Sequence, residues 1–351
     1  MPFEPWGPHL ARKAVDLFSG SGGVTAGLKS AGWAVVAAVD IDPVAASTYR
    51  ANHPEVAFFE ADLAKRSTID ALKKQVGSEV IDLLVVCAPC QPFSSQNRKR
   101  GSDPVRETLI LKSLAAVRAL KPKLVLFENV PGLVGPDYQD IIQRLFRLLG
   151  RAGYTVSGPN VEDASFYGVP QRRRRCIVVA AKDPNCLKRF DDAKPRSTKR
   201  TVQDAIADLR TLASGERDPD DILHFARKHS DIAIARLEAI SHDGGSRAEL
   251  PNHLVLKCHR QQTGFPDVYG RMKWRDVAPT LTTGCTDITR GRFAHPSQNR
   301  AITLREAARL QSFGDQYIFS GTARQIAIQI GNAVPPAMIR SFATAFEVAL
   351  G

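Results

Sequence analysis

The stretch AVDLFSGSGGVTAGL, residues 14–28, decides the fold, because it passes from an apolar run through a glycine-rich turn into a periodic apolar segment. The run at 14–18 predicts a buried strand, and the segment after Gly23 predicts a helix. Gly20, Gly22 and Gly23 permit backbone conformations that other residues avoid, and they let a ligand approach the start of the helix. A strand, a tight turn and a helix in this order predict the first unit of an α/β fold.

The same rhythm continues to about residue 181. Short runs rich in valine, isoleucine and leucine alternate with helix-length segments, a pattern typical of a mostly parallel sheet covered on both faces. The runs lie at 14–18, 34–40, 56–62, 80–87, 123–129, 154–162 and 176–181, and the helical segments include 43–53, 107–120 and 138–151. We therefore expect a doubly wound α/β domain that binds its ligands at the carboxyl ends of the strands.

The rhythm breaks after Lys182. From there to about residue 297 charged residues, proline, glycine and threonine are frequent, and a helical signal near 220–240 lies between loop-like segments. This composition predicts a second, smaller domain whose loops determine specificity. We divide the chain into a larger domain, residues 1–185 with 325–351, and a smaller domain, residues 186–324.

Regular patterns return near the carboxyl terminus. The stretch TLREAARLQSF at 303–313 predicts a helix with Thr303 as its N-cap, and Glu306 stands where it completes a capping box. The final stretch, IGNAVPPAMIRSFATAFEVALG at 330–351, predicts a loop followed by an amphipathic helix.

The composition is that of an ordinary globular protein, and its charge indicates a polyanionic partner. The 351 residues are 43% hydrophobic and 24% charged, and 48 Lys and Arg against 36 Asp and Glu give a net charge of +12. Nucleic acid is the commonest partner of so basic a chain. No apolar run approaches the roughly 20 residues of a membrane-spanning helix. The amino terminus, MPFEPWGPHLARK, lacks a signal-peptide pattern, so we expect a cytoplasmic protein.

Two acids at successive strand ends narrow the choice of ligand for the glycine-rich turn. Asp40 ends the second run, twenty residues after Gly20, where a carboxylate can hydrogen-bond ribose hydroxyls. Asp62 ends the third run, a position suited to an adenine amino group. A dinucleotide fingerprint requires glycine three residues after Gly22, and Thr25 stands there instead, which argues against NAD. S-adenosylmethionine, a nucleoside cofactor without a pyrophosphate, fits best, although a tight turn alone also needs such glycines.

The cysteines do not form a framework. The six cysteines are Cys87, Cys90, Cys176, Cys186, Cys258 and Cys285. One pair, Cys87 and Cys90, has CxxC spacing, and the eight histidines do not cluster with it, so we predict reduced thiols and no metal site. Cys87 lies inside an apolar run and is interpreted as strand packing. Cys90 follows that run between Pro89 and Pro92, where inert packing, a redox pair and a nucleophile all remain open.

An acid and a run of arginines follow. The next strand ends in FENV, which places Glu128 beside Cys90 if the two strands are neighbours. An acid after the buried run LVLF loses part of its solvation, which suits a proton donor. The string QRRRR would usually be a solvated charge run. If the last strand begins near Arg172, however, Arg173 and Arg175 share a face and can bind a carbonyl oxygen or a carboxylate.

Together these motifs resemble the DNA (cytosine-5)-methyltransferases, in their compact bacterial form, over almost the whole chain. They stand in the family's order: DLFSGSGG at 16–23, PCQPFS at 89–94, ENV at 128–130, QRRRR at 171–175, REAARLQSF at 305–313 and GNAVPP at 331–336. The stretch from about 186 to 265 carries no family motif, as expected of a variable target-recognition region. The resemblance implies a Rossmann-like methyltransferase fold, dependent on S-adenosylmethionine, with a smaller target-recognition domain.

The resemblance also implies roles for individual residues. Cys90 would add to C6 of a cytosine flipped out of double-stranded DNA, and C5 would then accept the methyl group. Glu128 would act at N3 of the base, Arg175 would bind its O2 carbonyl, and Arg173 would support that site. The positions implied to contact the cofactor are Asp16, Phe18, Gly20, Gly22, Gly23, Asp40, Ile41, Asp62, Pro89, Leu109, Asn332 and Val334. Those implied to contact DNA are Ser94, Gln96, Arg98, Lys99, Arg100, Arg106 and Thr280. Further candidates for DNA contact, chosen only from charge and loop position, are Arg260, Arg271, Lys273, Arg290 and Arg292.

Two alternatives remain open. A tRNA cytosine-5 methyltransferase shares the nucleophile motif, but its Cys-Phe-Thr element does not occur here, and the nearest segment is GCTDITRG at 284–291. A catalytically inactive relative would bind DNA through its basic surface. The sequence defines neither the DNA site nor a cognate restriction endonuclease, and we expect a monomer.

Overall fold

A seven-stranded sheet forms the core of the computed structural model, which describes residues 11–89, 109–256 and 267–351. In chain order the strands are β1 (Lys13–Leu17), β2 (Ala34–Asp40), β3 (Ala57–Glu60), β4 (Leu83–Val86), β5 (Leu124–Asn129), β6 (Thr155–Asp163) and β7 (Arg174–Ala181). Their order in the sheet is β3-β2-β1-β4-β5-β7-β6. Neighbours from β3 to β5 pair in parallel, whereas β7 runs antiparallel to β5 and β6 antiparallel to β7. The predicted mostly parallel sheet is confirmed.

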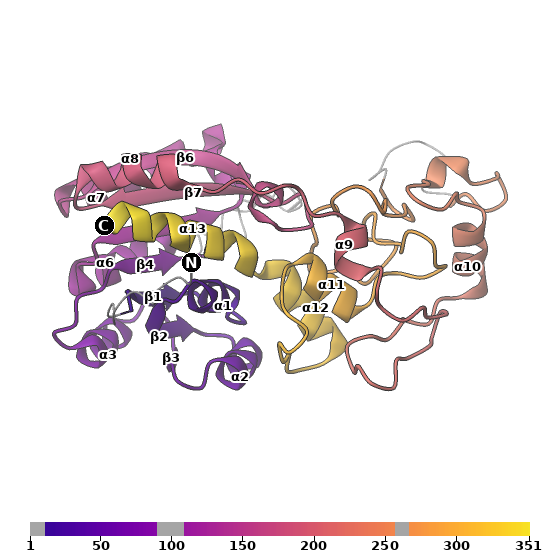
Figure 1. Ribbon diagram of the computed structural model, residues 1–351, viewed down its shortest axis with the longest axis horizontal. Helices are drawn as coiled ribbons and strands as arrows, with labels where there is room; N and C mark the ends of the chain where they lie inside the picture. Colours follow the sequence, from indigo (N-terminus) through magenta and orange to yellow (C-terminus); the bar gives the residue numbers. More distant parts are fainter. Residues whose placement is uncertain (1–10, 90–108, 257–266) are drawn as a thin grey trace, which may run out of the picture.

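Helices cover both faces of the sheet. One apolar cluster joins the sheet to α1 (Gly23–Ser30), α8 (Pro184–Ala193) and α13 (Pro336–Leu350). A second joins its other face to α3 (Arg66–Val76), α6 (Leu114–Leu120) and α7 (Gln139–Arg151). In Figure 1 the yellow α13 extends along the sheet to the carboxyl terminus, marked C. The short α5 (Leu109–Lys112) precedes α6, and α2 (Pro43–Asn52) connects β2 to β3.

The central strands are buried along their whole length, as their continuous apolar sequences predict. All four residues of β4, LLVV, and all six of β5, LVLFEN, are buried. The burial of β5 therefore includes two polar side chains, Glu128 and Asn129, at its carboxyl end. Burying polar side chains costs free energy unless they form hydrogen bonds or ion pairs. The partners of these two side chains are therefore described with the candidate active site.

A smaller region lies at one end of the molecule in Figure 1. It contains α9 (Val202–Ile206), α10 (Asp231–Glu238), α11 (Leu304–Leu310) and α12 (Ala323–Asn332). The Thr303 hydroxyl accepts the Glu306 N–H at 3.1 Å and the Glu306 carboxylate accepts the Thr303 N–H at 2.7 Å, which confirms the predicted capping box. The prediction that 330–332 begin a loop was wrong, because α12, which starts from its own capping box at Thr322, continues through Asn332.

α8 and α12 lie at the two predicted boundaries between the larger and the smaller domain. Leu187 and Phe190 of α8 belong to the apolar cluster of the sheet, and the Phe190 ring stacks on that of Phe346 with 4.3 Å between centroids. Ile326 and Ile330 of α12 belong to a cluster of the small region, with Leu304 of α11. The boundaries at 185/186 and 324/325 stay predictions.

Candidate active site

A buried ion pair lies where the carboxyl end of β5 meets the start of β7. The Arg175 Nε donates to the Glu128 Oε1 at 2.8 Å, and the two side chains are only 11% and 6% exposed. Arg175 also donates from Nη1 to the carbonyl of Arg174 at 2.8 Å. Because the pair is shielded from water, its geometry is fixed and its electrostatic field is only weakly screened. The edge of the sheet therefore presents one carboxylate and one guanidinium in a defined arrangement.

The strand that leads to Cys90 is the neighbour of β5, which carries Glu128 one residue before its end. β4 and β5 pair in parallel, with Val86 opposite Phe127, so the predicted adjacency is confirmed. The Asn129 side-chain amide donates to the carbonyl of Ala88 at 3.2 Å and fixes the chain that leaves β4. Cys90 itself lies outside the described residues. No role was assigned to Asn129 from the sequence. An amide that directly follows Glu128 in a buried strand could have been predicted to need a hydrogen-bond partner nearby.

The arginine run alternates between buried and exposed positions as predicted, although β7 begins at Arg174 and not near Arg172. Arg173 and Arg175 are 1% and 9% exposed, whereas Arg172 and Arg174 are exposed. The two buried guanidinium groups have different partners. Arg175 binds a carboxylate, while Arg173 donates to the carbonyls of Leu281 at 3.0 Å, Gly331 at 2.7 Å and Ala333 at 3.0 Å.

The turn between β1 and α1 is built around Asp40. Phe18 and Gly20 both have positive φ, of 59° and 52°, a conformation that costs a residue with a Cβ roughly 1–2 kcal/mol. The Gly20 N–H donates to Asp40 Oδ2 at 2.7 Å, and the Asp42 N–H donates to Oδ1 at 2.9 Å. Burial raises the pKa of Asp40, and these backbone donors oppose the rise. A Cβ built on Gly20 meets no atom within 4 Å, so the turn is open to a ligand at this residue.

The next two glycines are required by protein contacts. A Cβ on Gly22 would stand 2.7 Å from the Tyr317 hydroxyl and 2.8 Å from the His53 ring, and one on Gly23 would stand 2.6 Å from the carbonyl of Val334. Real Cβ atoms do not come so close to backbone oxygen, so the small residues allow the carboxyl-terminal segment to pack on the turn. These packing contacts require glycine at both positions without a ligand, and the assignment of Gly22 and Gly23 to the cofactor stays a prediction.

Asp16 lies beneath the turn, completely buried. The Thr25 hydroxyl donates to its Oδ2 at 2.9 Å and is also 2.8 Å from the Tyr49 hydroxyl, while Oδ1 has no hydrogen-bond partner among the described residues. Burial raises the pKa of Asp16 to about 7, with the Thr25 hydrogen bond acting against the rise. Thr25, which argued against a dinucleotide fingerprint, therefore connects the helix to this carboxyl.

We expect Asp16→Asn to remove a pH-dependent loss of stability. The folded-state pKa of about 7 lies above the ordinary 3.8, so the folded protein gains stability from the protonated form, and this gain is lost as pH rises through about 7. Between about pH 5 and about pH 8 the free energy of unfolding should shift by about 2.5 kcal/mol in favour of the variant. Urea unfolding of both proteins without cofactor measures this difference, and histidines common to both cancel. Parallel pH curves would contradict the prediction.

The remaining cofactor positions surround the same edge. Ile41 is 65% exposed directly after Asp40, and Pro89 and Asn332 are exposed. Asp62 is half-buried and its Oδ1 accepts the Ala64 N–H at 2.8 Å. Leu109 is half-buried at the start of α5, and Val334 is buried against Gly23. Their roles stay predictions.

The described cysteines are structural by their surroundings. Cys87 is half-buried and packs against the apolar cluster on the α13 face. Burial raises the pKa of Cys176 and of Cys285 to about 12, so neither thiol ionises readily. Across the described part of the chain, no three His, Cys, Asp or Glu side chains stand together in a way that could hold a metal ion.

The candidate DNA-contacting residues differ in exposure: some are exposed, and others are held by contacts within the protein. Arg290 and Lys273 are exposed, and Thr280 is exposed with its hydroxyl donating to the carbonyl of Arg172 at 2.6 Å. The Arg292 guanidinium donates to Asp267 at 3.1 Å and to backbone carbonyls. The suggestion that Arg271 reads DNA was wrong, because the side chain is 0% exposed and its guanidinium is occupied by carbonyls of its own region. Ser94, Gln96, Arg98, Lys99, Arg100, Arg106 and Arg260 lie outside the described residues.

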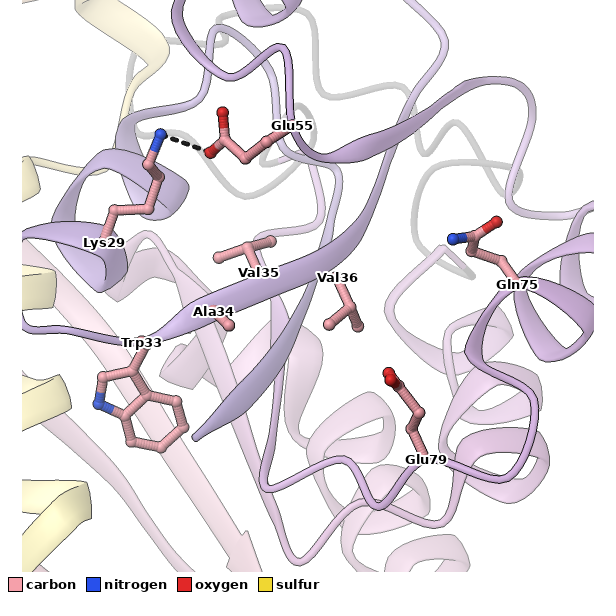
Figure 2. Close-up of a pocket in the computed structure, with 8 residues that line it drawn as sticks. All are labelled: Lys29, Trp33, Ala34, Val35, Val36, Glu55, Gln75 and Glu79. Carbon is pink, nitrogen blue, oxygen red and sulfur yellow. Dashed lines mark ion pairs between the residues drawn. The ribbon is translucent and has the colours of Figure 1, made fainter. Parts of the chain in front are cut away.

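A pocket of about 480 Å³ lies at the opposite edge of the sheet. Figure 2 shows Ala34 and Val36 of β2 between the Lys29–Glu55 ion pair on one side and Gln75 with Glu79 on the other. These are the amino-terminal residues of β2, whereas Glu128 and Asp40 stand at carboxyl ends. This pocket is therefore separate from the candidate active site.

Comparison with known proteins agrees with the fold and the motifs. The family model described as C-5 cytosine-specific DNA methylase matches residues 12–347. The Type II methylase M.HgiDII of Herpetosiphon aurantiacus is 36% identical over 341 residues, which cover 95% of this chain and 94% of that protein. The Type II methyltransferase M.Eco47II of Escherichia coli is 32% identical over 327 residues, which cover 92% and 75%.

Solved structures place the chain in the same class. A prophage-encoded Escherichia coli protein, provisionally assigned as a DNA modification methyltransferase, aligns with a TM-score of 0.76 and 25% identity over 97% of this chain and 99% of its own. The fold is thus that of the α/β methyltransferases. The chain belongs to the C-5 cytosine-specific DNA methylase family, whose enzymes are DNA (cytosine-5)-methyltransferases. Within the described ranges, no helix has both the length and the apolar character to cross a bilayer.

Proposed function

We propose that this enzyme transfers a methyl group from S-adenosylmethionine to C5 of a cytosine flipped out of a specific double-stranded DNA sequence, through a covalent bond between Cys90 and C6. The observation that supports this most strongly is the buried Glu128–Arg175 pair, with Nε and Oε1 2.8 Å apart, at the end of the strand next to the one that leads to Cys90. A carboxyl and a guanidinium so placed match the N3 and O2 edge of a cytosine ring.

The chemistry follows from electron flow in the base. Cytosine C6 is a poor electrophile, and the attack of the Cys90 thiolate pushes an electron pair toward C5, N3 and O2. Glu128 shares a proton with N3 and the Arg175 guanidinium donates to O2, so the developing charge is compensated in a water-poor site. The enamine C5 then accepts the methyl group as the bond from that group to the sulfonium sulfur breaks and leaves a neutral thioether. The C5 proton passes to solvent, the thiolate is expelled from C6 and the N3 proton returns to Glu128, which releases 5-methylcytosine and restores the enzyme. The base must leave the duplex because stacking buries its ring.

The residues around the β1–α1 turn fit S-adenosylmethionine, which supplies the methyl group on a sulfonium sulfur. The Asp40 carboxylate is oriented by two backbone N–H groups and retains lone pairs for ribose hydroxyls. Ile41, 65% exposed, offers an apolar surface to an adenine ring, and Gly20 leaves the backbone open. We assign Phe18, Asp62, Pro89, Leu109, Asn332 and Val334 to the same pocket, and Asp16, Gly22 and Gly23 to its support, because protein atoms surround these three.

We extend the proposal to the DNA contacts, the two domains and the partners of the enzyme. The segment containing Ser94, Gln96, Arg98, Lys99, Arg100 and Arg106 would close on DNA, and Thr280, Arg290 and Arg292 would face it. The sheet domain would bind cofactor and cytosine, and the smaller domain would recognise the target. We propose a monomer, because one chain contributes both the Glu128–Arg175 ion pair and the β1–α1 turn. We also propose that the enzyme acts in the cytoplasm. Because its relatives are named Type II enzymes, we also propose that a restriction endonuclease recognises the same site.

Bisulfite sequencing of plasmid DNA from cells that express the protein tests this proposal. We expect 5-methylcytosine at one position of one short recurring sequence, and none in cells carrying the empty vector. Transfer of labelled methyl groups in vitro should occur with duplex DNA and not with tRNA. Transfer of label to tRNA and not to DNA would instead show that the enzyme is a tRNA cytosine-5 methyltransferase. Transfer to neither nucleic acid would support a catalytically inactive DNA-binding protein.

A further inference from the structure

One buried junction joins three segments that are distant in the sequence. The Arg173 guanidinium, on a side chain 1% exposed, donates to Leu281 of the small region and to Gly331 and Ala333 at the end of α12. Gln171 accepts the Leu281 N–H at 2.9 Å. We call this set the Arg173 junction; it comprises Gln171, Arg173, Leu281, Gln311, Gly331 and Ala333.

Two further contacts leave the junction little freedom. The Gln311 amide donates to the same Ala333 carbonyl at 2.5 Å. A Cβ on Gly331 would stand 2.5 Å from the carbonyl carbon and oxygen of Thr282, so the end of α12 and the 282–283 backbone are in direct contact. Backbone groups in such contact cannot shift independently, because interiors are close-packed.

The junction lies between the two proposed binding surfaces. Leu281 directly follows Thr280, which we place at the DNA. Ala333 directly precedes Val334, whose carbonyl contacts Gly23 at the start of α1, in the turn that we assign to the cofactor. A continuous path of hydrogen bonds and backbone contacts therefore joins the 280–283 loop to the cofactor turn.

We propose that Arg173 is a positioning residue that couples DNA binding to cofactor binding, which rests on the function proposed above. The planar guanidinium donates from several nitrogens in fixed directions to carbonyls of both segments at once, whereas a lysine ammonium carries its three donors on one nitrogen and cannot span the same carbonyls. When DNA orders the 280–283 loop, the junction orders 331–334 and thereby the cofactor turn. By linkage, the cofactor strengthens DNA binding by the same factor.

The test compares the S-adenosylhomocysteine dissociation constant with and without a duplex oligonucleotide carrying the site found by bisulfite sequencing. For the parent enzyme we expect DNA to lower this constant on the order of tenfold, within the usual range of such couplings. Arg173→Lys should reduce the ratio to below about twofold. Arg271→Lys is the matched control, because Arg271 is equally buried and also donates to three backbone carbonyls, all within the small region.

A second pair of variants keeps the test decisive if Arg173→Lys does not fold. Gly331→Ala should also reduce the ratio, since its methyl group would meet the Thr282 backbone, whereas Gly150→Ala on α7 meets no atom within 4 Å. A parental ratio in either junction variant, with a lowered melting temperature, would overturn the coupling role and leave Arg173 structural. The same ratio close to one in the parent would also overturn it. Methyl transfer by the parent enzyme is measured separately, so failure of the coupling is distinguishable from failure of the proposed function.

Discussion

We expect the Cys90→Ala enzyme to lose methyl transfer to DNA and the Cys87→Ala enzyme to keep it, although the two cysteines form one CxxC pair. Cys90 would supply the thiolate that bonds to C6, and alanine has no nucleophile, so the rate should fall by a factor on the order of 10⁴ or more. Cys87 is half-buried against the apolar cluster, and its loss should lower the free energy of unfolding by about 1 kcal/mol. Transfer of tritiated methyl groups to duplex DNA measures activity, and urea unfolding measures stability.

The structure provides the reason for separating the two thiols. β4 ends at Val86, Cys87 still packs against the core, and Pro89 is already exposed, so the chain has left the core by the residue before Cys90. A redox or metal pair would need both thiols equally. Equal loss of methyl transfer in two well-folded variants would therefore refute the assignment of Cys90 as the sole nucleophile.

The strand positions were predictable because a parallel sheet buries each strand on both faces. Such strands appear as continuous apolar runs, and all six residues of β5, including Glu128, are indeed buried. The burial of both Arg173 and Arg175 was predicted from the two-residue period of a strand, although β7 begins only at Arg174. Local sequence therefore located the candidate acid and the buried arginines.

The partners of these groups were not predictable, because they come from residues far along the chain. Arg173 and Arg175 are both buried, yet Arg175 binds a carboxylate of β5 whereas Arg173 binds the carbonyls of residues 281, 331 and 333. Gly22 and Gly23 looked like ligand contacts, and their neighbours turn out to be His53, Tyr317 and Val334. These pairings depend on tertiary packing, which sequence periodicity does not encode.

Arg271 is a residue whose burial the sequence did not predict. An arginine in a loop-like segment is usually solvated, so its charge suggested a contact with DNA. In the structure it is completely buried and donates to the carbonyls of Leu237, His295 and Gln298. Irregular segments lack backbone ladders, and a buried guanidinium with several donors satisfies carbonyls that no strand or helix supplies.

Glu128→Gln is expected to reduce turnover by a factor of about 10² to 10⁴ while DNA binding stays within about threefold of the parent. Glutamine has nearly the same shape and still accepts a hydrogen bond from Arg175, but it cannot share a proton with N3. The uncompensated guanidinium also weakens the fold, because removing one partner of a buried ion pair typically costs about 3–5 kcal/mol. Single-turnover methyl transfer, DNA binding by fluorescence anisotropy and thermal unfolding separate these effects.

Glu162→Gln is the matched control for the loss of stability. Glu162 on β6 pairs with Lys194 at 2.8 Å, and the two side chains are 13% and 15% exposed, so the variant also disrupts a largely buried ion pair. It should lose stability in the same direction and keep turnover within about threefold, since neither residue belongs to the candidate active site. A similar fall in turnover in both variants would show that weakened folding explains the loss. Near-parental turnover in a folded Glu128→Gln enzyme would refute the role of Glu128 as the acid, because charge and proton are what the substitution removes.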